Sequence, residues 1–373
     1  MTILLSNEDV QALLTMEETL RAVEEAYREF GQGRAANRPR SDLYSQTRLP
    51  DAFHIFKTME GTLPSRGVVA LRIDSNLVRW REVNGKLRKE GVPVAKGNTF
   101  LGLVLLFSIE NGELLAIMPD GYLQKMRVGA TNGLAAKYLA PEDASAVGLL
   151  GSGWQAGAQL MALACVRPLR QVRVYSPNAA HREDFAREMT DQLGLPVEPV
   201  GEPALAAEGA DILVSATNSI ARTVEPEWVH EGQFVTCIKY SELGPEVLAR
   251  CGKVFVNSNH AAPETYLPGY GRRDVHDPVE YLVPSRAAAT SDEPTAGGGH
   301  HAEPDWGAYP ELQDLIGGQS PGRTSEGEVT GFVNNIGLGI QFAAVGAVIY
   351  EAAQRANAGR QIPVEWFLQS VHP

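Results

Sequence analysis

The segment VGLLGSGWQAGAQ, residues 147 to 159, has the glycine spacing of a turn that can bind a dinucleotide. Gly151, Gly153 and Ala156 form the pattern G-x-G-x-x-A between an apolar run and a helical stretch. In such a turn the first glycine permits the tight bend, the second lets a pyrophosphate approach the backbone, and the small third residue lets helix and strand pack closely. Free N–H groups at the start of the helix then attract the phosphates. The pattern therefore predicts dinucleotide binding, and the alternative is a purely structural bend.

The residues after the second strand of this unit bear on which dinucleotide is bound. An NAD site usually has a carboxylate about 20 residues after the glycines, but this chain has VYSPNAAHR there. Without that charge, a 2′-phosphate could be received by Ser176, Asn178, His181 or Arg182, although Arg182 could equally be a solvated helix residue. NADP(H) is therefore favoured, with NAD(H) as the alternative. The predicted cofactor-binding residues are Gly151, Ser152, Gly153, Trp154, Gln155, Ser176, Asn178, Arg182, Ala216, Thr217 and Asn218.

The elements around the glycine turn alternate between strands and helices. Apolar runs such as AVGLL, QVRVYS, DILVSAT, QFVTCIK and KVFVN are separated by helical stretches. This alternation predicts crossover connections and a parallel sheet, which is a Rossmann arrangement. The stretch VSATNS, residues 214 to 219, would then lie at the carboxyl edge where ligands bind, although small polar residues are also common in plain turns.

The first 120 residues follow a different pattern. Two helices open the chain, capped by Ser6 and by Thr15 with Glu18. Strands follow at AFHIFKTME, GVVALRIDSN and LGLVLLFSIENGELLAIM, where the Asn111-Gly112 pair predicts a hairpin. The polar stretch 79–98 between them is expected to be a long loop that either covers a site or is a solvated excursion. The fold class is thus α/β, a Rossmann domain joined to a mixed α+β domain.

Composition narrows the class of partner. The chain has 373 residues and a formal charge of -12, without a long basic run, which disfavours nucleic acid and anionic membranes. No run of about 18 uncharged apolar residues occurs, so no membrane span is expected. Three widely spaced cysteines argue against a disulfide framework or a clustered zinc site. We expect a cytoplasmic protein with a small ligand.

The stretch from residue 262 to 322 is rich in Pro, Gly and His and includes GGGHHAEPDWGAYP. His300, His301, Glu303 and Asp305 could suggest a metal site. Metal ligands require convergent geometry and a rigid surrounding shell, which a triple-glycine loop does not supply. We therefore predict no metal, and the segment is interpreted as a surface loop that could also form a lid.

With these residues in view, the chain resembles the ornithine cyclodeaminase and mu-crystallin family. The resemblance lies in the glycine turn with its following RP, and in the blocks IMPDGYLQKMRVGATNGLAAKYLA, ADILVSATNS and GRTSEGEVTGFVNNIGLG. It implies a homodimer in which residues 1–125 with 325–373 form a substrate-binding and dimerisation domain. Residues 126–324 would form the Rossmann NAD(P)-binding domain. Members of the family move hydride between NAD(P) and the carbon of an amine or imine next to a carboxylate.

The resemblance also implies substrate-binding residues. Arg127 matches the family arginine that binds the substrate carboxylate, a task suited to the two parallel N–H groups of a guanidinium. Arg40 matches a second basic contact, for which Arg38 is an alternative. Arg72 falls where the family normally has a lysine near the substrate. Because an arginine is effectively always charged, it can anchor a substrate but cannot serve as a proton donor.

Departures from the family pattern leave the proton donor open. Where cyclodeaminases have an aspartate, this chain has Ser241 followed by Glu242, so Glu242 or Lys239 is predicted to be catalytic. Val128 and Phe342 replace a threonine and an aspartate of the family. These changes favour an NAD(P)H-dependent oxidoreductase of small imino or amino acids, of the ketimine reductase or amino-acid dehydrogenase type. The alternatives are a cyclodeaminase-type lyase with recycled NAD and a non-catalytic NADP-binding protein of mu-crystallin type.

Overall fold

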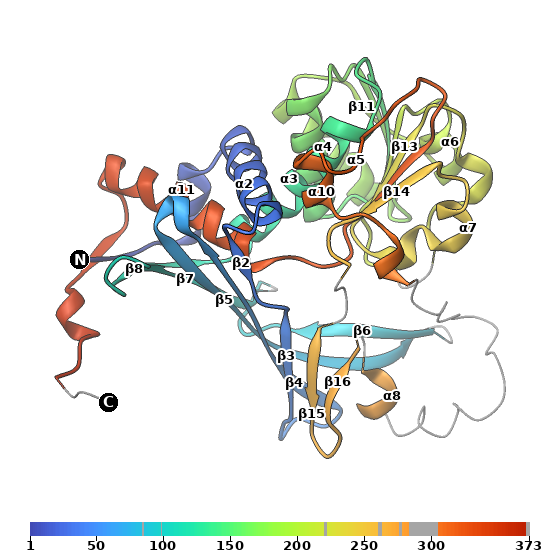
Figure 1. The fold of residues 1–373 in the computed structure, drawn as a ribbon. Helices are drawn as coiled ribbons and strands as arrows, with labels where there is room; N and C mark the ends of the chain where they lie inside the picture. The colour runs from blue at the N-terminus through green and yellow to red at the C-terminus, as the bar shows by residue number, and fades with distance from the viewer. Residues whose placement is uncertain are drawn as a thin grey trace.

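Two sheets organise the chain, and helices α2 and α3 lie between them (Figure 1). The computed structural model describes residues 1–83, 86–97, 99–219, 222–259, 263–275, 278–282 and 305–370. The helices are α1 (Asn7–Leu13), α2 (Met16–Gly31), α3 (Gly121–Leu139), α4 (Trp154–Val166), α5 (Ala179–Leu193), α6 (Pro203–Ala207), α7 (Gly244–Leu248), α8 (Val279–Leu282), α10 (Leu312–Ile316) and α11 (Gly339–Ala356). Short 3-10 helices are η1 (Pro64–Arg66), η2 (Pro226–Trp228), η3 (Tyr240–Glu242), η4 (Trp306–Ala308) and η5 (Val364–Trp366).

The predicted caps of the first two helices are present. The Ser6 hydroxyl accepts from the Asp9 N–H, and the Asp9 carboxylate accepts from the Ser6 N–H. Thr15 and Glu18 make the same reciprocal pair at the start of α2. Each box satisfies two N–H groups that the helix itself leaves without partners, which fixes where the helix begins.

The first sheet has eleven strands and is mostly antiparallel. Its main path runs β16-β15-β3-β4-β5-β7-β8-β1-β18, with β2 paired to β4 and β6 paired to β5. The strands are β1 (Thr2–Leu4), β2 (Ala36–Asn37), β3 (Ser41–Gln46), β4 (Ala52–Leu63), β5 (Val68–Val83), β6 (Lys86–Val92), β7 (Leu101–Ser108), β8 (Leu114–Pro119), β15 (Glu264–Leu267), β16 (Gly271–Asp274) and β18 (Arg360–Ile362). The hairpin predicted at Asn111-Gly112 joins β7 to β8, and Gly112 has the positive φ (74°) that such a turn requires.

The second sheet has seven parallel strands in the order β11-β10-β9-β12-β13-β17-β14. They are β9 (Ala146–Leu150), β10 (Gln171–Tyr175), β11 (Val197–Pro199), β12 (Ile212–Ser215), β13 (Phe234–Cys237), β14 (Lys253–Val256) and β17 (Thr330–Val333). The predicted α/β fold with a parallel Rossmann sheet is confirmed. The chain leaves this sheet after β14, adds β15 and β16 to the other sheet, and returns to insert β17 between β13 and β14.

Two parts of the sequence prediction need adjustment. The stretch 79–98 was expected to be a loop, but most of it continues β5 and forms β6, which pairs with β5 over residues 77–83. The predicted domain limits also cut across the sheets, because β15 and β16 lie in the first sheet and β17 in the second. Sequence order alone does not show that the chain crosses between the sheets three times after β14.

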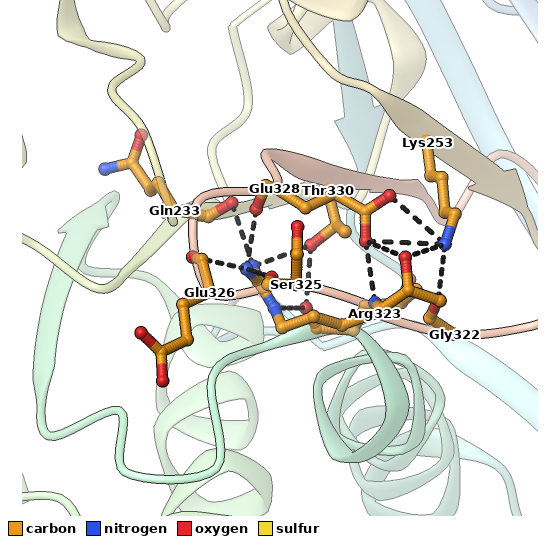
Figure 2. Close-up of polar contacts among 10 residues, drawn as sticks. Gln233, Lys253, Gly322, Arg323, Ser325, Glu326, Glu328 and Thr330 are labelled. Carbon is orange, nitrogen blue, oxygen red and sulfur yellow. Dashed lines mark hydrogen bonds and ion pairs between the residues drawn. The ribbon is translucent and has the colours of Figure 1, made fainter.

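Arg323 ties the end of α3 to the start of the β13–β17 pair (Figure 2). Its Nε donates to the Leu139 carbonyl at 2.7 Å, and its Nη1 donates to the Glu328 carbonyl at 2.6 Å. Its Nη2 donates to the Gln233 carbonyl and to the Thr330 hydroxyl. A single guanidinium, with five N–H donors in one plane, therefore satisfies backbone acceptors from three segments.

Helix α11 covers the inner face of the first sheet over β4 and β5, at a distance that glycines set. A Cβ on Gly61 would lie 2.2 Å from the Ile340 nitrogen, and a Cβ on Gly339 would lie 2.1 Å from the Glu60 carbonyl. The helix start thus touches the strand backbone directly. The Asn37 carboxamide oxygen accepts from the Gly339 N–H at 2.5 Å and supplies a cap for α11.

The sequence also led to expectations about the cysteines, membrane spans and a metal site. The three cysteines carry free thiols, with Cys237 buried and Cys165 exposed. Among the described helices, none is long and apolar enough to cross a membrane. His300, His301 and Glu303 lie outside the described residues, while Asp305 caps η4 by accepting from the Gly307 N–H. Within the described ranges, no three His, Cys, Asp or Glu side chains converge on a common point.

Candidate active site

The glycine turn between β9 and α4 lies at the carboxyl edge of the parallel sheet. Gly151 has φ of 115°, and a Cβ there would lie 2.2 Å from the Ala216 carbonyl. Only glycine fits this close approach of β9 and β12. A Cβ on Gly153, by contrast, would meet no described atom within 4 Å, so the backbone before α4 is open to a ligand. The turn fits a dinucleotide pyrophosphate at the start of a helix.

The first turn of α4 presents side chains next to this opening. Trp154 is 57% exposed, and the Lys125 ammonium from α3 lies 5.7 Å from the centre of its ring. The Gln155 Oε1 atom is buried and has no hydrogen-bond partner within the described part of the chain. Ser152 is half-buried. A bound group with a donor would satisfy the Gln155 oxygen.

The end of β10 contains the residues predicted to distinguish the two dinucleotides. Arg182 donates from Nη1 to the Ser176 carbonyl and lies over the Tyr175 ring at 5.8 Å. Its Nε is buried without a partner among the described residues. Asn178 caps α5 by accepting from the His181 N–H at 3.1 Å. Arg182 is therefore held at the strand end and is not a freely solvated helix residue.

The Glu242 carboxylate joins the ends of β12 and β13. Its Oε1 accepts from the Thr217 N–H and hydroxyl at 2.7 and 2.8 Å, and its Oε2 accepts from the N–H groups of Ile238 and Lys239 at 3.1 Å each. The Lys239 ammonium donates to the Ser219 carbonyl. Burial raises the pKa of Glu242 and lowers that of Lys239. These contacts favour a structural role for both residues, which were predicted to be catalytic. Asn218, at the same edge, is exposed.

A band of charged side chains crosses the inner face of the first sheet, and we call it the charged band. Register places Asp42, Lys57, Asp74 and Gly102 side by side on β3, β4, β5 and β7. Directly opposite residues of antiparallel strands share one face. The charged band consists of Arg40, Asp42, Lys57, Arg72, Asp74, Asp120 and Arg127.

Apolar side chains border the charged band on both sides. Met59, Ala70 and Val104 belong to the large core under α11. Ile55 and Trp80 belong to a smaller cluster at the other end of the same strands. Charged groups are rarely placed between two apolar clusters unless they are paired or bind a ligand.

Ion pairs link most members of the charged band. Arg40 holds Asp42 with two hydrogen bonds of 3.0 Å. Arg72 lies 2.7 Å from Asp120 and 3.3 Å from Asp74. A Cβ on Gly102 would lie 2.0 Å from the Asp120 carboxylate, so this glycine makes the room for Asp120 over β7. Burial raises the pKa of Asp120.

Arg127 is buried in the middle of α3. It donates to the Gln341 Oε1 at 2.9 Å and to the Gln124 Oε1 at 2.8 Å, and its Nε has no partner in the described ranges. A Cβ on Gly337 would overlap its guanidinium at 2.2 Å. Burial, and then the charge of Arg72, lower the pKa of Arg127 to about 9. A buried cation that makes no ion pair with a described residue is stabilised by an anion.

Phe342 separates the two central arginines. The guanidinium carbons of Arg72 and Arg127 lie 5.7 and 5.0 Å from the centre of its ring. Phe342 stands where the family resemblance implies an aspartate. A ring attracts both cations through its face without neutralising their charge. The replacement leaves that charge available to a ligand.

Hydrogen bonds connect the charged band to the carboxyl edge of the parallel sheet. Gln341 donates to the hydroxyls of Tyr27 and Thr131, and the Tyr27 hydroxyl donates to the side-chain Oδ1 of Asn257, which follows β14. Asn132, on the same helix as Arg127, donates to the Cys237 carbonyl at the end of β13. Arg127 is therefore linked through Gln341 and its own helix to the edge of the parallel sheet at which the dinucleotide turn also lies.

The structure also resolves one alternative and adds residues that the sequence analysis missed. Arg40 is part of the charged band, whereas the side chain of Arg38 is 61% exposed and faces Glu60. Lys57, Asp74 and Asp120 were not singled out. Period-two alternation marks Lys57 and Asp74 as sharing a strand face with apolar neighbours, and Asp120 directly follows β8. Only the strand register brings them together.

Comparisons with known proteins agree with this arrangement. A sequence profile described as Ornithine cyclodeaminase/mu-crystallin family matches residues 1–357. The chain belongs to this family. A Delta(1)-pyrroline-2-carboxylate reductase of Bacillus cereus is 30% identical over 270 residues, covering 71% of this chain and 74% of that protein. The resemblance stated from the sequence is confirmed.

Two solved structures extend the comparison to the whole fold. The Delta(1)-pyrroline-2-carboxylate reductase of Thermococcus litoralis, in complex with NADH and L-proline, has a TM-score of 0.73 at 26% identity and covers 97% of this chain and 100% of its own. An archaeal alanine dehydrogenase dimer with bound NAD has a TM-score of 0.70 at 26% identity, covering 97% of this chain and 99% of its own. The predicted enzyme class, an NAD(P)-dependent oxidoreductase, is confirmed.

Proposed function

We propose that this protein is an NAD(P)H-dependent reductase of a small imine that bears a carboxylate next to its C=N carbon. The charged band carries the proposal. Arg40, Lys57, Arg72 and Arg127 are four cations against the three carboxylates of Asp42, Asp74 and Asp120. One positive charge is left over beside the carboxyl edge of the parallel sheet, which suits a ligand with one negative charge.

Each residue then has a task in this reaction. Arg127, with Arg72, would bind the substrate carboxylate through paired N–H groups, and Arg40 would hold Asp42 in place. Gly151, Gly153 and the start of α4 would hold the dinucleotide, which supplies the hydride when bound. Fixing the carboxylate fixes the neighbouring carbon relative to the nicotinamide, and this positioning lowers the barrier.

The preference for NADP(H) over NAD(H) is part of the proposal. Residues 176–182, which follow β10, include no carboxylate. Arg182 is held there with a buried Nε that lacks a partner among the described residues. A guanidinium in this place favours a 2′-phosphate. Arg182→Met should weaken binding of NADPH and leave binding of NADH unchanged, measured by fluorescence titration. Equal loss for both dinucleotides would contradict the preference.

A homodimer is also proposed, with the second copy on the outer face of the first sheet. Side chains of β5 and β7 that alternate with the inner positions, such as Leu71, Ile73, Leu103 and Leu105, are apolar and only half-buried in one chain. Sheets bury such faces by packing against another sheet. β5 and β7, within the predicted domain of residues 1–125 with 325–373, would supply this interface. Residues 126–324 without β15 and β16, together with β17, would form the dinucleotide domain of a cytoplasmic enzyme. Analytical ultracentrifugation tests the dimer.

One experiment tests the activity. NADPH and NADH are titrated by fluorescence, and their oxidation is then followed with 2-oxo acids plus ammonia or methylamine and with cyclic imino acids. Oxidation that requires an imine, preformed or made from both components, is the expected result. Oxidation by the 2-oxo acid alone would contradict imine chemistry.

The two other candidate functions give different outcomes in the same assay. A lyase would release ammonia from ornithine with catalytic NAD and no added reductant. A binding protein would bind the dinucleotide tightly and turn over nothing. The surplus positive charge of the charged band favours a carboxylate ligand for the reductase, the lyase and the binding protein alike. The assay, and not the fold, therefore distinguishes these three functions.

A further inference from the structure

We propose that Lys57 is the proton donor of the reaction, supplied from β4 because the neighbouring strand carries Arg72 instead of a lysine. The inference rests on the proposed function and adds the residue that it lacks. An arginine at position 72 can bind a carboxylate but cannot give up a proton at neutral pH. Lys57 is the lysine that the described strands place in the charged band.

The position of Lys57 follows from the strand register. On β4 it lies between Ile55 and Met59, whose side chains are both buried on the inner face. Asp42 of β3 and Asp74 of β5 are its direct cross-strand partners. Its ammonium lies 3.7 Å from the Asp74 Oδ2, and the same oxygen lies 3.3 Å from Arg72. One carboxylate therefore holds the lysine and the arginine side by side.

The environment suits an ammonium that gives and regains a proton. The lysine side chain is 24% exposed, so water can return the proton after turnover. Among the described residues, Asp42 and Asp74 flank it across the strands, Arg40 pairs with Asp42, and Arg72 shares the Asp74 carboxylate with it. Two carboxylates therefore flank the ammonium and hold it within the charged band.

The reaction step balances in atoms and electrons. Lys57 donates a proton to the imine nitrogen, whose C=N π electrons become a nitrogen-centred pair as the carbon receives hydride from the reduced nicotinamide. The C=N bond becomes a C–N single bond with one new C–H and one new N–H bond. The dinucleotide leaves oxidised, and the neutral lysine takes a proton from water.

The test compares Lys57→Met with Lys57→Arg. Both should lower kcat for imine reduction by about 100- to 10,000-fold, the usual contribution of a positioned acid. Arg keeps the charge beside Asp74 but cannot donate the proton. Binding of NADPH, and quenching of its fluorescence by a carboxylate ligand, should stay near the unmodified values in Lys57→Arg. The matched control is Lys137→Met, which removes a lysine of α3 that pairs with Glu24 of α2. This variant should keep kcat.

A second variant tests whether a lysine on β5 can replace the lysine on β4 as proton donor. In the double variant Lys57→Met with Arg72→Lys, a lysine returns to the neighbouring position on the same face, and kcat should recover at least tenfold over Lys57→Met. In the unmodified enzyme kcat should fall as pH rises, as expected for a general acid, and Lys57→Met should lose this dependence.

The outcomes separate the two proposals. Full kcat in Lys57→Arg would show that only the charge matters and would overturn the proton-donor role, as would full kcat in Lys57→Met. Either result leaves the reductase activity standing. Absence of imine-dependent oxidation by the unmodified protein would instead overturn the proposed function, and the role of Lys57 with it.

Discussion

The two halves of the candidate site are built in different ways. At the carboxyl edge of the parallel sheet, one short segment supplies the glycine turn, and its backbone does the binding. In the charged band, seven side chains come from β3, β4, β5, α3 and the residues next to them. The first half is local in sequence, whereas the second exists only when four strands pair in register. Changes to the two halves should therefore fail differently.

The largest effect is expected at Gly151. Gly151→Val introduces a β-branched side chain at φ 115° and places its Cβ 2.2 Å from the Ala216 carbonyl. We expect a loss of about 3 kcal/mol or more in the free energy of unfolding, because both the conformation and the space are unsuitable. Urea denaturation measures this loss.

Gly153→Ala is the matched control for Gly151→Val. Its φ is -90°, and an added Cβ meets no described atom within 4 Å. The variant should fold normally, while its dinucleotide affinity falls because the methyl group occupies the space of the pyrophosphate. Unchanged affinity would show that the phosphates do not approach this residue.

Arg127→Met tests the charged band. It removes the cation of the band that makes no ion pair with a described residue, and it should raise KM for the imino acid by on the order of 100-fold, equivalent to losing a buried charged contact. Affinity for NADPH should remain, because the glycine turn is untouched. Steady-state kinetics and fluorescence titration separate the two quantities. If Arg127→Met weakened NADPH binding as much as it raised KM for the imino acid, the two halves of the site would not be independent.

Arg323→Met provides the counterpart among arginines with structural contacts. It removes six hydrogen bonds to described acceptors, five of them backbone carbonyls. We expect the free energy of unfolding to fall by about 2–4 kcal/mol, with KM for substrate unchanged at temperatures where the variant is folded. A raised KM without loss of stability would indicate that Arg323 reaches the ligand.

The difference between the two halves also explains what could be predicted from sequence. The glycine turn, the parallel strands, the capped helices and the Asn111-Gly112 hairpin are local signals, and each was predicted. Lys57 and Asp74 are 17 residues apart in sequence and meet only because β4 pairs with β5. Asp120 joins them through Gly102, a contact that no spacing rule reveals. Sequence therefore predicts the elements, while the register of the antiparallel sheet determines the substrate half of the site.

The smallest effect is expected at Glu242, where the two readings of one residue can be separated. If the carboxylate is structural, Glu242→Gln lowers the free energy of unfolding by about 1 kcal/mol at neutral pH, since an amide replaces one of two accepting oxygens.

Burial raises the pKa of Glu242 in the folded protein. The folded chain therefore binds this proton more tightly than the unfolded chain. The pH-dependent part of the stability that Glu242 contributes is then fully present below its unfolded pKa and is lost as pH rises through its folded pKa. The deficit of Glu242→Gln should accordingly widen as pH falls, as denaturation measured across that range would show. If Glu242→Gln keeps the stability of the unmodified protein but its kcat falls 100-fold, Glu242 is the proton donor. Lys57 would then not have the role proposed for it.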